Sequence, residues 1–328
     1  MKKFLKFLLY AVLVVVVLVG SLLTYVKTAL PNVGAPEDIT VERTPERIER
    51  GRYLAHSVSI CMDCHSTRDW SKFSGPLTEG TLGKGGERFD QSVGMPGVFI
   101  SKNITPEGIA RYTDGELFRV ITSGVNKEGK AMFPLMPYPY YGRMDREDIY
   151  SIIAYVRTLE PISNPVPDSE PDFPMNFILN TIPKAAQSQS RPNPSDQLAY
   201  GAYMVNATAC VECHTQVKQG QIIPEVAFGG GREFSFPDSS KVRSANISPD
   251  KQTGIGNWTR EQFVARFKMY TDSSYVLPSV KPGEFNTIMP WTMYAGMTEE
   301  DLSAIFAYLQ TVAPVSNQVT KFSPAGAK

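Results

Sequence analysis

Hydrophobic positions divide this chain into one long apolar run at its start and several amphipathic segments further on. The run covers 20 uncharged residues, 7–26, between a basic beginning with three lysines and Lys27. As a helix rising 1.5 Å per residue, it would measure about 30 Å, the thickness of a bilayer core. We therefore predict a transmembrane segment within residues 1–30. Three lysines before it and one after it place the N-terminus inside and the remaining chain outside.

A cleaved signal peptide and a buried helix of a soluble protein are the alternatives for this segment. A signal peptide has a shorter apolar region and ends in a small-residue cleavage site. Neither Thr-Tyr-Val at residues 24–26 nor Thr-Ala-Leu at residues 28–30 forms a good site of that kind. The uncharged run at the extreme terminus also disfavours a soluble core helix. The pattern therefore favours an uncleaved signal anchor.

Two later segments have apolar residues at the i, i+3, i+4, i+7 spacing of an amphipathic helix. One follows Asp145 and the other follows Thr298; their apolar positions are Ile149, Ile152, Ile153 and Val156, and Leu302, Ile305, Phe306 and Leu309. Thr298-x-x-Asp301 resembles the capping box of a helix start. Residues 46–57 and 196–206 are predicted as two further helices. The loops between them are rich in Gly and Pro and show little strand signal.

All four cysteines lie in two copies of one motif, Cys-Met-Asp-Cys-His at residues 61–65 and Cys-Val-Glu-Cys-His at residues 210–214. The two copies also use two of the three histidines. C-x-x-C-H is the attachment pattern of a c-type haem, whose vinyl groups bond to the thiols while the histidine binds the iron. The candidate attachment residues are Cys61, Cys64, Cys210 and Cys213, and the candidate proximal ligands are His65 and His214. We therefore expect two covalently attached haem c groups.

Two other uses of paired cysteines fit less well. Structural zinc takes four ligands in short local pairs, whereas Cys64 and Cys210 are 146 positions apart and each pair has its own histidine. A thioredoxin-like C-x-x-C would need a βαβ context, and the sequence shows none.

The chain repeats itself around the two motifs. Residues 51–54, 85–89 and 101–106 correspond to 201–204, 230–234 and 244–249, and Met136-Pro137 and Met144 correspond to Met289-Pro290 and Met297. We therefore predict one domain at residues 43–160, a second at 195–315 and a C-terminal tail at 316–328.

The segment between the two predicted domains, residues 161–194, holds eight prolines and is predicted as a linker. Its apolar stretch, residues 173–182, favours a strap packed on a domain surface. A linker that is disordered throughout is the alternative.

The second axial ligand of each iron decides whether the site is open for catalysis or closed for electron transfer. Two bis-histidine haems would need four histidines, and beyond the two motifs the chain has only His56, which we interpret as a packing or surface residue. Methionine closes such a site with a soft sulfur ligand that favours reduced iron. Met136 and Met289 are the candidates, because both occupy equivalent positions before a proline. Met144 and Met297 are more typical of core residues, and Met132 and Met293 break the repeat.

These motifs, the Met-Pro elements and the helix endings at residues 154–159 and 307–312 resemble the class I cytochrome c domain. Residues 43–315 resemble a tandem di-haem cytochrome c and are similar to the cytochrome subunits of membrane-bound quinoprotein and molybdenum dehydrogenases. Larger members of that family carry three haem motifs, and this chain has two. The resemblance implies an all-α fold, with two tandem cytochrome c domains behind one N-terminal transmembrane helix.

The resemblance also implies a membrane-anchored carrier that passes single electrons from a dehydrogenase or quinol-side donor to a terminal acceptor. Its expected partners are redox proteins, among them a dehydrogenase and a terminal oxidase. Haem attachment of this kind occurs outside the cytoplasmic membrane, which implies a single-pass protein with its haem domains on the periplasmic side. The sequence offers no Ser/His/Asp or Cys/His catalytic set, so a non-catalytic carrier or redox subunit is favoured. Balanced charge, with 33 basic and 33 acidic residues, argues against nucleic acid as a partner.

Three alternative functions have to be compared with the electron carrier. A di-haem cytochrome c peroxidase also carries two C-x-x-C-H motifs, but it needs one haem with an open or displaceable axial position. A thiosulfate-oxidising di-haem protein uses a further cysteine as a distal ligand, and both motifs have already consumed all four. An assembly subunit with purely structural haems is compatible with the sequence, and measured redox potentials would test it.

Overall fold

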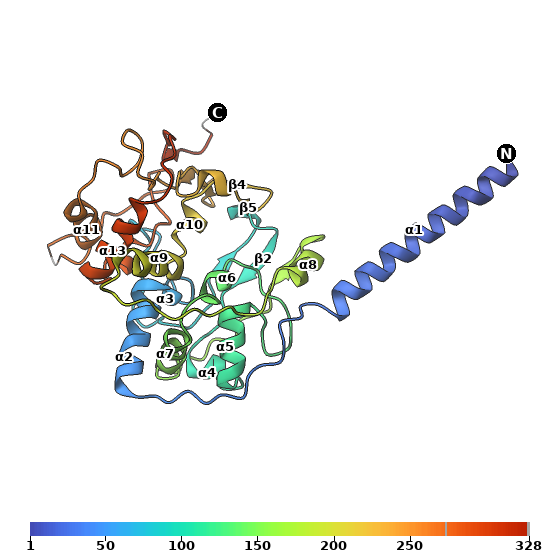
Figure 1. Ribbon diagram of the computed structural model, residues 1–328, viewed down its shortest axis with the longest axis horizontal. Helices are drawn as coiled ribbons and strands as arrows, with labels where there is room; N and C mark the ends of the chain where they lie inside the picture. Colours follow the sequence, from blue (N-terminus) through green and yellow to red (C-terminus); the bar gives the residue numbers. More distant parts are fainter. Residues whose placement is uncertain (273, 327–328) are drawn as a thin grey trace.

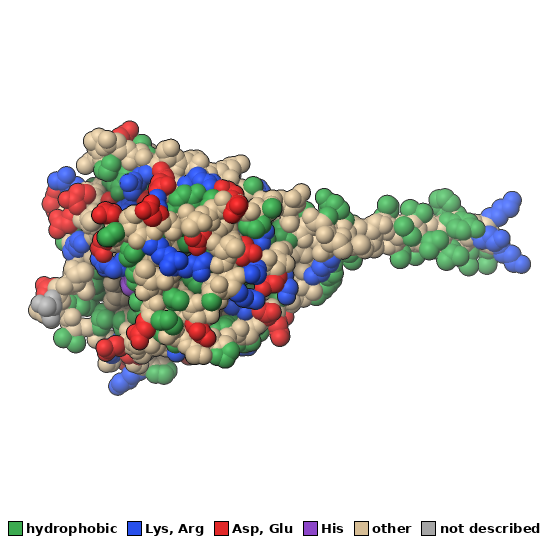
Figure 2. Space-filling model, turned by 90° about the horizontal axis from the view of Figure 1, so that it is seen from below, with side chains coloured by type: hydrophobic (Ala, Val, Ile, Leu, Met, Phe, Trp, Pro, Cys, Tyr) green, Lys and Arg blue, Asp and Glu red, His purple; other side chains and the backbone are tan. Residues whose placement is uncertain are grey.

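The computed structural model describes residues 1–326 apart from residue 273. Figure 1 shows helix α1, Lys2–Thr28, projecting as a single rod from a body that contains all the other elements. None of the α1 residues is buried, although most of its side chains are apolar. In Figure 2, hydrophobic side chains cover the rod between the lysines at its tip and the body. This helix is long and apolar enough to cross a membrane.

The body has two halves, the first with the cysteine motif at residues 61–65 and the second with the motif at residues 210–214. The first half is built around two crossing helices. Helix α2, Pro45–Tyr53, begins at Thr44, whose side chain accepts the Arg47 N–H, and it continues as the π-helical turn η1, Leu54–Val58. It packs across α7, Arg146–Val156, at Gly51. A Cβ atom on Gly51 would lie 1.8 Å from the Ser151 carbonyl oxygen, so only glycine permits this approach.

The second half repeats this crossing. Helix α9, Gln197–Ala207, packs against α13, Glu299–Leu309. At Gly201 a Cβ atom would lie 2.0 Å from the Ala304 carbonyl oxygen. The four predicted amphipathic or motif-leading helices are therefore confirmed.

Shorter helices fill the loops of both halves. The first half contains α3 (Cys61–Cys64), η2 (Gln91–Val93), α4 (Pro106–Ile109), α5 (Asp114–Ser123) and α6 (Tyr138–Tyr141). The second contains α10 (Cys210–Cys213), η4 (Pro224–Val226), α11 (Arg260–Lys268) and α12 (Trp291–Tyr294), and α8 (Met175–Ile178) and η3 (Leu179–Thr181) lie between the halves. Helices α5 and α11 both begin with a complete capping box, Thr113 with Glu116 and Thr259 with Gln262.

The all-α prediction is wrong, because small antiparallel sheets accompany the helices in the described part of the chain. Strands β1 (Arg88–Phe89), β2 (Gly97–Ile100) and β3 (Glu170–Pro171) form one antiparallel sheet. Strands β6 (Glu233–Ser235), β7 (Lys241–Arg243) and β8 (Phe322–Ser323) form another, and β4 (Val217–Lys218) pairs with β5 (Gln221–Ile222). Each strand has two to four residues, too few to show a two-residue period in the sequence. Strands β3 and β8 come from the predicted linker and tail, so tertiary packing creates these sheets.

The Pro-rich segment at residues 161–194 follows the surface of the body. The Asn164 side-chain amide donates to the Lys84 carbonyl oxygen at 2.8 Å, and the Gln187 backbone N–H donates to the Gly142 carbonyl oxygen at 2.8 Å. Near its end, the Arg191 guanidinium lies 2.9 Å from the Asp148 carboxylate. The domain limits at 43–160, 161–194, 195–315 and 316–328 stay a prediction.

The two halves exchange equivalent contacts across their boundary. The Tyr203 hydroxyl of the second half donates to Asp148 of the first at 2.6 Å, and the Tyr53 hydroxyl of the first half donates to Asp301 of the second. Each tyrosine oxygen also accepts the backbone N–H at the start of the partner helix, from Asp145 and from Thr298. The halves therefore meet through a repeated, crosswise arrangement.

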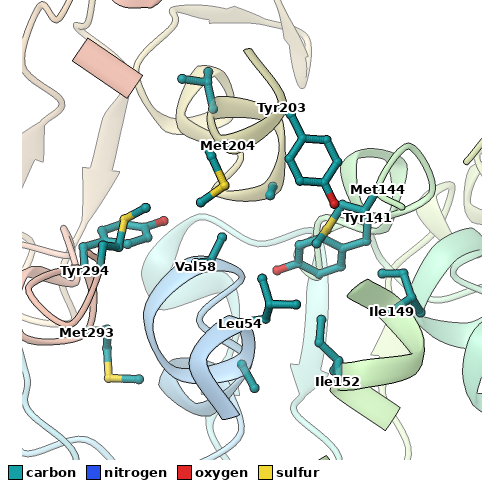
Figure 3. Close-up of a cluster of buried hydrophobic side chains, with 14 of the residues drawn as sticks. Leu54, Val58, Tyr141, Met144, Ile149, Ile152, Tyr203, Met204, Met293 and Tyr294 are labelled. Carbon is teal, nitrogen blue, oxygen red and sulfur yellow. The ribbon is translucent and has the colours of Figure 1, made fainter. Parts of the chain in front are cut away.

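A single cluster of buried apolar side chains spans this boundary. Figure 3 shows Leu54 and Val58 of the first half lying near Met204 of the second half. All three side chains are fully buried. Burial of this kind stabilises the two halves as one unit.

Candidate metal centres

Each cysteine motif folds as a single helical turn entered through a left-handed residue. Ile60 has φ 43° before α3, and Ala209 has φ 51° before α10. Within a helical turn, residues i and i+3 share one face, so both thiols of a motif project from the same side. The following His65 and His214 backbone N–H groups close the turns on Cys61 and Cys210.

Both motif histidines are held in the same tautomer by a backbone carbonyl. His65 Nδ1 lies 2.6 Å from the Lys102 carbonyl oxygen, and His214 Nδ1 lies 2.8 Å from the Ala245 carbonyl oxygen. A carbonyl oxygen only accepts, so Nδ1 carries the proton and Nε2 keeps a lone pair for a metal. Burial lowers the pKa of both imidazoles, which favours this neutral form.

Glycine allows the loops that carry these carbonyl groups to approach the histidines. Gly85 has φ 68°, and its N–H donates to the His65 carbonyl oxygen at 2.8 Å. A Cβ atom there would lie 2.5 Å from the Lys102 carbonyl carbon. Gly230 repeats the arrangement, with φ 67° and a hydrogen bond of 2.8 Å to the His214 carbonyl oxygen. The Gly-Gly pairs of the sequence repeat therefore position the groups that orient the histidines.

The thiols lie in surroundings that keep them protonated. Burial raises the pKa of Cys61 and Cys64 to about 12, and it also raises that of Cys210. Zinc sites and reactive cysteines depend on a lowered thiol pKa instead. Within residues 1–272 and 274–326, no group of three or more His, Cys, Asp or Glu side chains is placed to share an ion.

The acidic residue inside each motif is neutralised by an arginine. Asp63 lies 3.1 Å from Arg68, which also contacts Glu87 at 3.0 Å, and Glu212 lies 2.7 Å from Arg232. Burial raises the pKa of Asp63, and the Arg68 charge opposes that shift. The pair beside the second motif is therefore balanced in charge, whereas at the first motif one arginine lies between two carboxylates.

The two candidate methionine ligands occupy equivalent, half-buried positions. Met136 and Met289 both pack against the main apolar core and precede the prolines that start α6 and α12. Their carbonyl oxygens accept the N–H groups of Tyr138 at 2.7 Å and Trp291 at 2.8 Å. By contrast, the alternatives Met144 and Met297 are 0% and 1% exposed.

Two tyrosines, which sequence reasoning missed, connect the methionine loops to the cysteine motifs. The Tyr141 hydroxyl donates to the Ser59 carbonyl oxygen at 2.7 Å, and the Tyr294 hydroxyl donates to the Thr208 carbonyl oxygen at 3.0 Å. Burial raises the pKa of both hydroxyls well above its usual value, so they stay donors. Each tyrosine lies five positions after its methionine, and this match within the repeat is the signal that could have found them.

A cavity of about 330 Å³ brings the second set of candidate residues together. Cys210, His214 and Met289 all line it, and Met297 lies on its wall as well. The remaining lining includes the aromatic side chains of Trp258, Phe263, Phe267, Trp291 and Tyr294. A thiol, an imidazole and a thioether around one apolar cavity fit a haem c, since these are the groups that attach and ligate it.

Comparison with known proteins identifies this region. The cytochrome c family matches residues 198–313. The cytochrome c subunit of alcohol dehydrogenase (quinone) from Gluconacetobacter polyoxogenes is 27% identical over 289 residues, which cover 82% of this chain and 56% of that protein. The fructose dehydrogenase cytochrome subunit of Gluconobacter japonicus is 27% identical, over 85% of this chain and 56% of that protein. The gluconate 2-dehydrogenase cytochrome c subunit of Pantoea cypripedii is 24% identical, over 84% of this chain and 62% of that protein.

The chain thus spans a little over half the length of these relatives. The family match includes Cys210, Cys213, His214 and Met289 but not the first half of the body. The prediction of two tandem cytochrome c domains is therefore wrong as stated, because one domain is recognised. One physical difference lies in η1, where a π-helical turn precedes the first motif, whereas α9 stays α-helical before the second.

The cytochrome c match and the cavity around the second motif agree on one kind of cofactor, a covalently bound haem c. The relatives extend the likeness to 82% or more of the chain. The chain therefore contains a cytochrome c domain at residues 198–313 and is homologous to the cytochrome c subunits of bacterial dehydrogenases.

Proposed function

We propose that this chain is a membrane-anchored electron carrier with two haem c groups, one at each C-x-x-C-H motif. Cys61, Cys64 and His65, with Met136, would hold the first haem. Cys210, Cys213 and His214, with Met289, would hold the second. The observation that carries the second site is the cavity lined by Cys210, His214 and Met289. The first site is supported by His65, whose Nδ1 contact with a backbone carbonyl oxygen matches that of His214. A haem c bound there supplies one-electron chemistry between ferric and ferrous iron.

The protein residues would make each site a closed electron-transfer site. The carbonyl oxygens of Lys102 and Ala245 fix the imidazoles with Nε2 free to bind iron. The thioether sulfurs of the two methionines favour the reduced iron and leave no position for a substrate. Aromatic side chains around the second cavity exclude water and lower the local dielectric constant.

The first half supports the second site directly. Ser74 lies nine residues after His65, and its hydroxyl donates to the Met289 carbonyl oxygen at 2.7 Å. The same hydroxyl oxygen accepts the Trp291 N–H at 3.0 Å. On the other side of the boundary, the Tyr140 hydroxyl donates to Glu212 of the second motif at 2.8 Å. We propose two haem-binding units, residues 43–160 and 195–315, whose sites these contacts would hold in a fixed relative position.

We infer the location and partners from α1 and from the named relatives. Helix α1 would be an uncleaved anchor in the cytoplasmic membrane, with the haem-binding body on the periplasmic side. The chain would accept electrons from a dehydrogenase, as the names of its relatives suggest, and would not itself transform the substrate. The terminal acceptor stays a prediction, and the names of the three relatives reported above mention no terminal oxidase.

The axial methionines can be tested by the optical spectrum of the oxidised, purified protein. Methionine ligation gives a weak sulfur-to-iron band at the far-red end of the visible spectrum. We expect Met136→Leu and Met289→Leu each to remove about half of this band, because each would open one of the two haems. Met132→Leu and Met293→Leu are the matched controls and should keep it whole.

The same proteins distinguish the carrier from a di-haem peroxidase. A carrier with two closed sites stays low-spin and does not turn over hydrogen peroxide with a reduced donor. High-spin iron in the resting wild-type protein, together with peroxide turnover, would favour the peroxidase and contradict the proposal.

The donor can be tested in membranes that contain the chain. Alcohol, fructose and gluconate are the substrates named for its relatives. If a dehydrogenase of this kind is the donor, one of them reduces the haems anaerobically. Membranes without the chain serve as the control for other cytochromes.

A further inference from the structure

The body exposes a small apolar segment where α1 joins it. This segment, residues 173–178, includes α8 and is called the apolar knuckle below. The Phe173 side chain is 79% exposed and that of Ile178 is 43% exposed. Pro174 between them is exposed as well, so three exposed apolar side chains fall within six residues, whereas single scattered ones would need no explanation.

The apolar knuckle is bonded to the last turn of α1. The Lys27 Nζ atom donates to the Asn176 carbonyl oxygen at 2.8 Å and lies 4.7 Å from the centre of the Phe177 ring. From the neighbouring η3 turn, the Asn180 side-chain amide donates to the Val26 carbonyl oxygen at 3.2 Å. Figure 1 shows α8 on the side of the body from which α1 projects. The knuckle therefore has a fixed position relative to the end of the helix.

That position corresponds to the surface of a bilayer. The uncharged run of α1 ends at Val26, and about 30 Å of helix fills the hydrocarbon core. Lys27 then lies at the level of the lipid headgroups, where lysine side chains extend toward water. Helices that lie on a membrane surface bury Trp, Phe and Leu side chains at the boundary between headgroups and acyl chains. The Phe173 and Phe177 ring centres lie 6.3 Å apart, edge to face.

We propose that the apolar knuckle is a second membrane contact, which inserts Phe173 and Ile178 into the interface of the bilayer that α1 spans. The proposal rests on the membrane anchoring proposed above. It would hold the body against the membrane in one orientation and so present the haem sites to partners at a fixed height. Exposed acidic residues adjoin the knuckle, Glu170 and Asp172, so the contact depends on apolar insertion and needs no anionic lipid.

Nitroxide labels on the full-length haem-loaded protein test this placement. Phe173→Cys and Ile178→Cys introduce single thiols, since the native cysteines are bonded to haem in that protein. Val15→Cys in α1 is the control inside the bilayer, and Val276→Cys, 83% exposed on the body, is the control in water. Wild-type protein treated with the label checks that no native thiol reacts. The labelled proteins are reconstituted into protein-free phosphatidylcholine vesicles and floated on a density gradient.

The readout is the ratio of collisions with oxygen, which partitions into lipid, to collisions with a water-soluble nickel chelate. We expect the labels at 173 and 178 to show a ratio several-fold above that at 276 and below that at 15. Labels at 173 and 178 that match 276 in floated protein would overturn the contact while leaving the anchor intact. Protein that does not float with the vesicles would overturn the anchor, and with it this proposal.

Discussion

Asp148 is the residue at which the boundary between the two halves can be tested most sharply. Its side chain is 2% exposed and accepts four hydrogen bonds. Arg50 supplies two of them, at 2.9 and 3.0 Å, Arg191 supplies one at 2.9 Å, and the Tyr203 hydroxyl supplies one at 2.6 Å. Burial and the Asp148 charge both raise the pKa of Tyr203, so the hydroxyl stays a donor.

The cost of Asp148→Ala follows from these contacts. Removing one partner of a buried ion pair costs about 3–5 kcal/mol, because the remaining charge is left without compensation. Arg50 and Arg191 retain access to water, with 24% and 41% of their side chains exposed, so we expect the lower end, about 3 kcal/mol. Tyr203→Phe removes only the hydroxyl and should cost about 1 kcal/mol.

Urea unfolding of the haem-loaded protein, followed by circular dichroism in one detergent, measures these free energies. Glu147→Ala is the matched control on the same helix. The Glu147 side chain is 65% exposed, so its ion pair with Arg47 should contribute less than about 1 kcal/mol to the stability. An Asp148→Ala protein as stable as the Glu147→Ala protein would refute this account of the boundary.

Three further predictions concern single positions. Gly201→Ala should destabilise the protein by about 1–3 kcal/mol, because the added Cβ atom would meet the Ala304 carbonyl oxygen. Ala199→Leu, on the exposed face of α9, should change the stability little, and urea unfolding compares the two variants. Tyr294→Phe should lower the stability by about 1 kcal/mol, because it removes the donor to the Thr208 carbonyl oxygen. Calorimetry compares the variant with wild type, and equal melting temperatures would count against this contact. The His56 ring lies 2.6 Å from the Tyr155 hydroxyl, and burial lowers the pKa of this imidazole. The neutral ring therefore contributes to the stability of the folded protein above about pH 6.5, the pKa in the unfolded chain, and this contribution is lost as the pH falls through the folded-state pKa. The melting temperature of wild type should therefore drop more between about pH 8 and pH 5 than that of His56→Gln, and equal drops would contradict the assignment.

Local patterns in the sequence predicted the elements that depend on local physics. The apolar stripes after Asp145 and Thr298 became α7 and α13, which begin at Arg146 and Glu299. The apolar run at residues 7–26 lies within α1. These elements follow from a helical period that nearby residues create by themselves.

The rest depends on contacts between distant residues. The short strands pair segments as far apart as Lys241 and Ser323, so their sequences carry too little pattern to predict them. Tyr53 and Asp301 are 248 positions apart, and the repeat alone suggests pairing within each half rather than across the boundary. The carbonyl groups that orient His65 and His214 were also missed, because a backbone group leaves no signal in the sequence.

The number of haems per chain tests the central claim most directly. Intact mass spectrometry of the purified protein, with the covalent cofactor retained, gives this number for wild type and for two variants. Two haems in wild type, one in Cys61→Ala/Cys64→Ala and one in Cys210→Ala/Cys213→Ala are the expected results. A single haem in wild type that is lost only from Cys210→Ala/Cys213→Ala would contradict the account, since the first motif would then bind none.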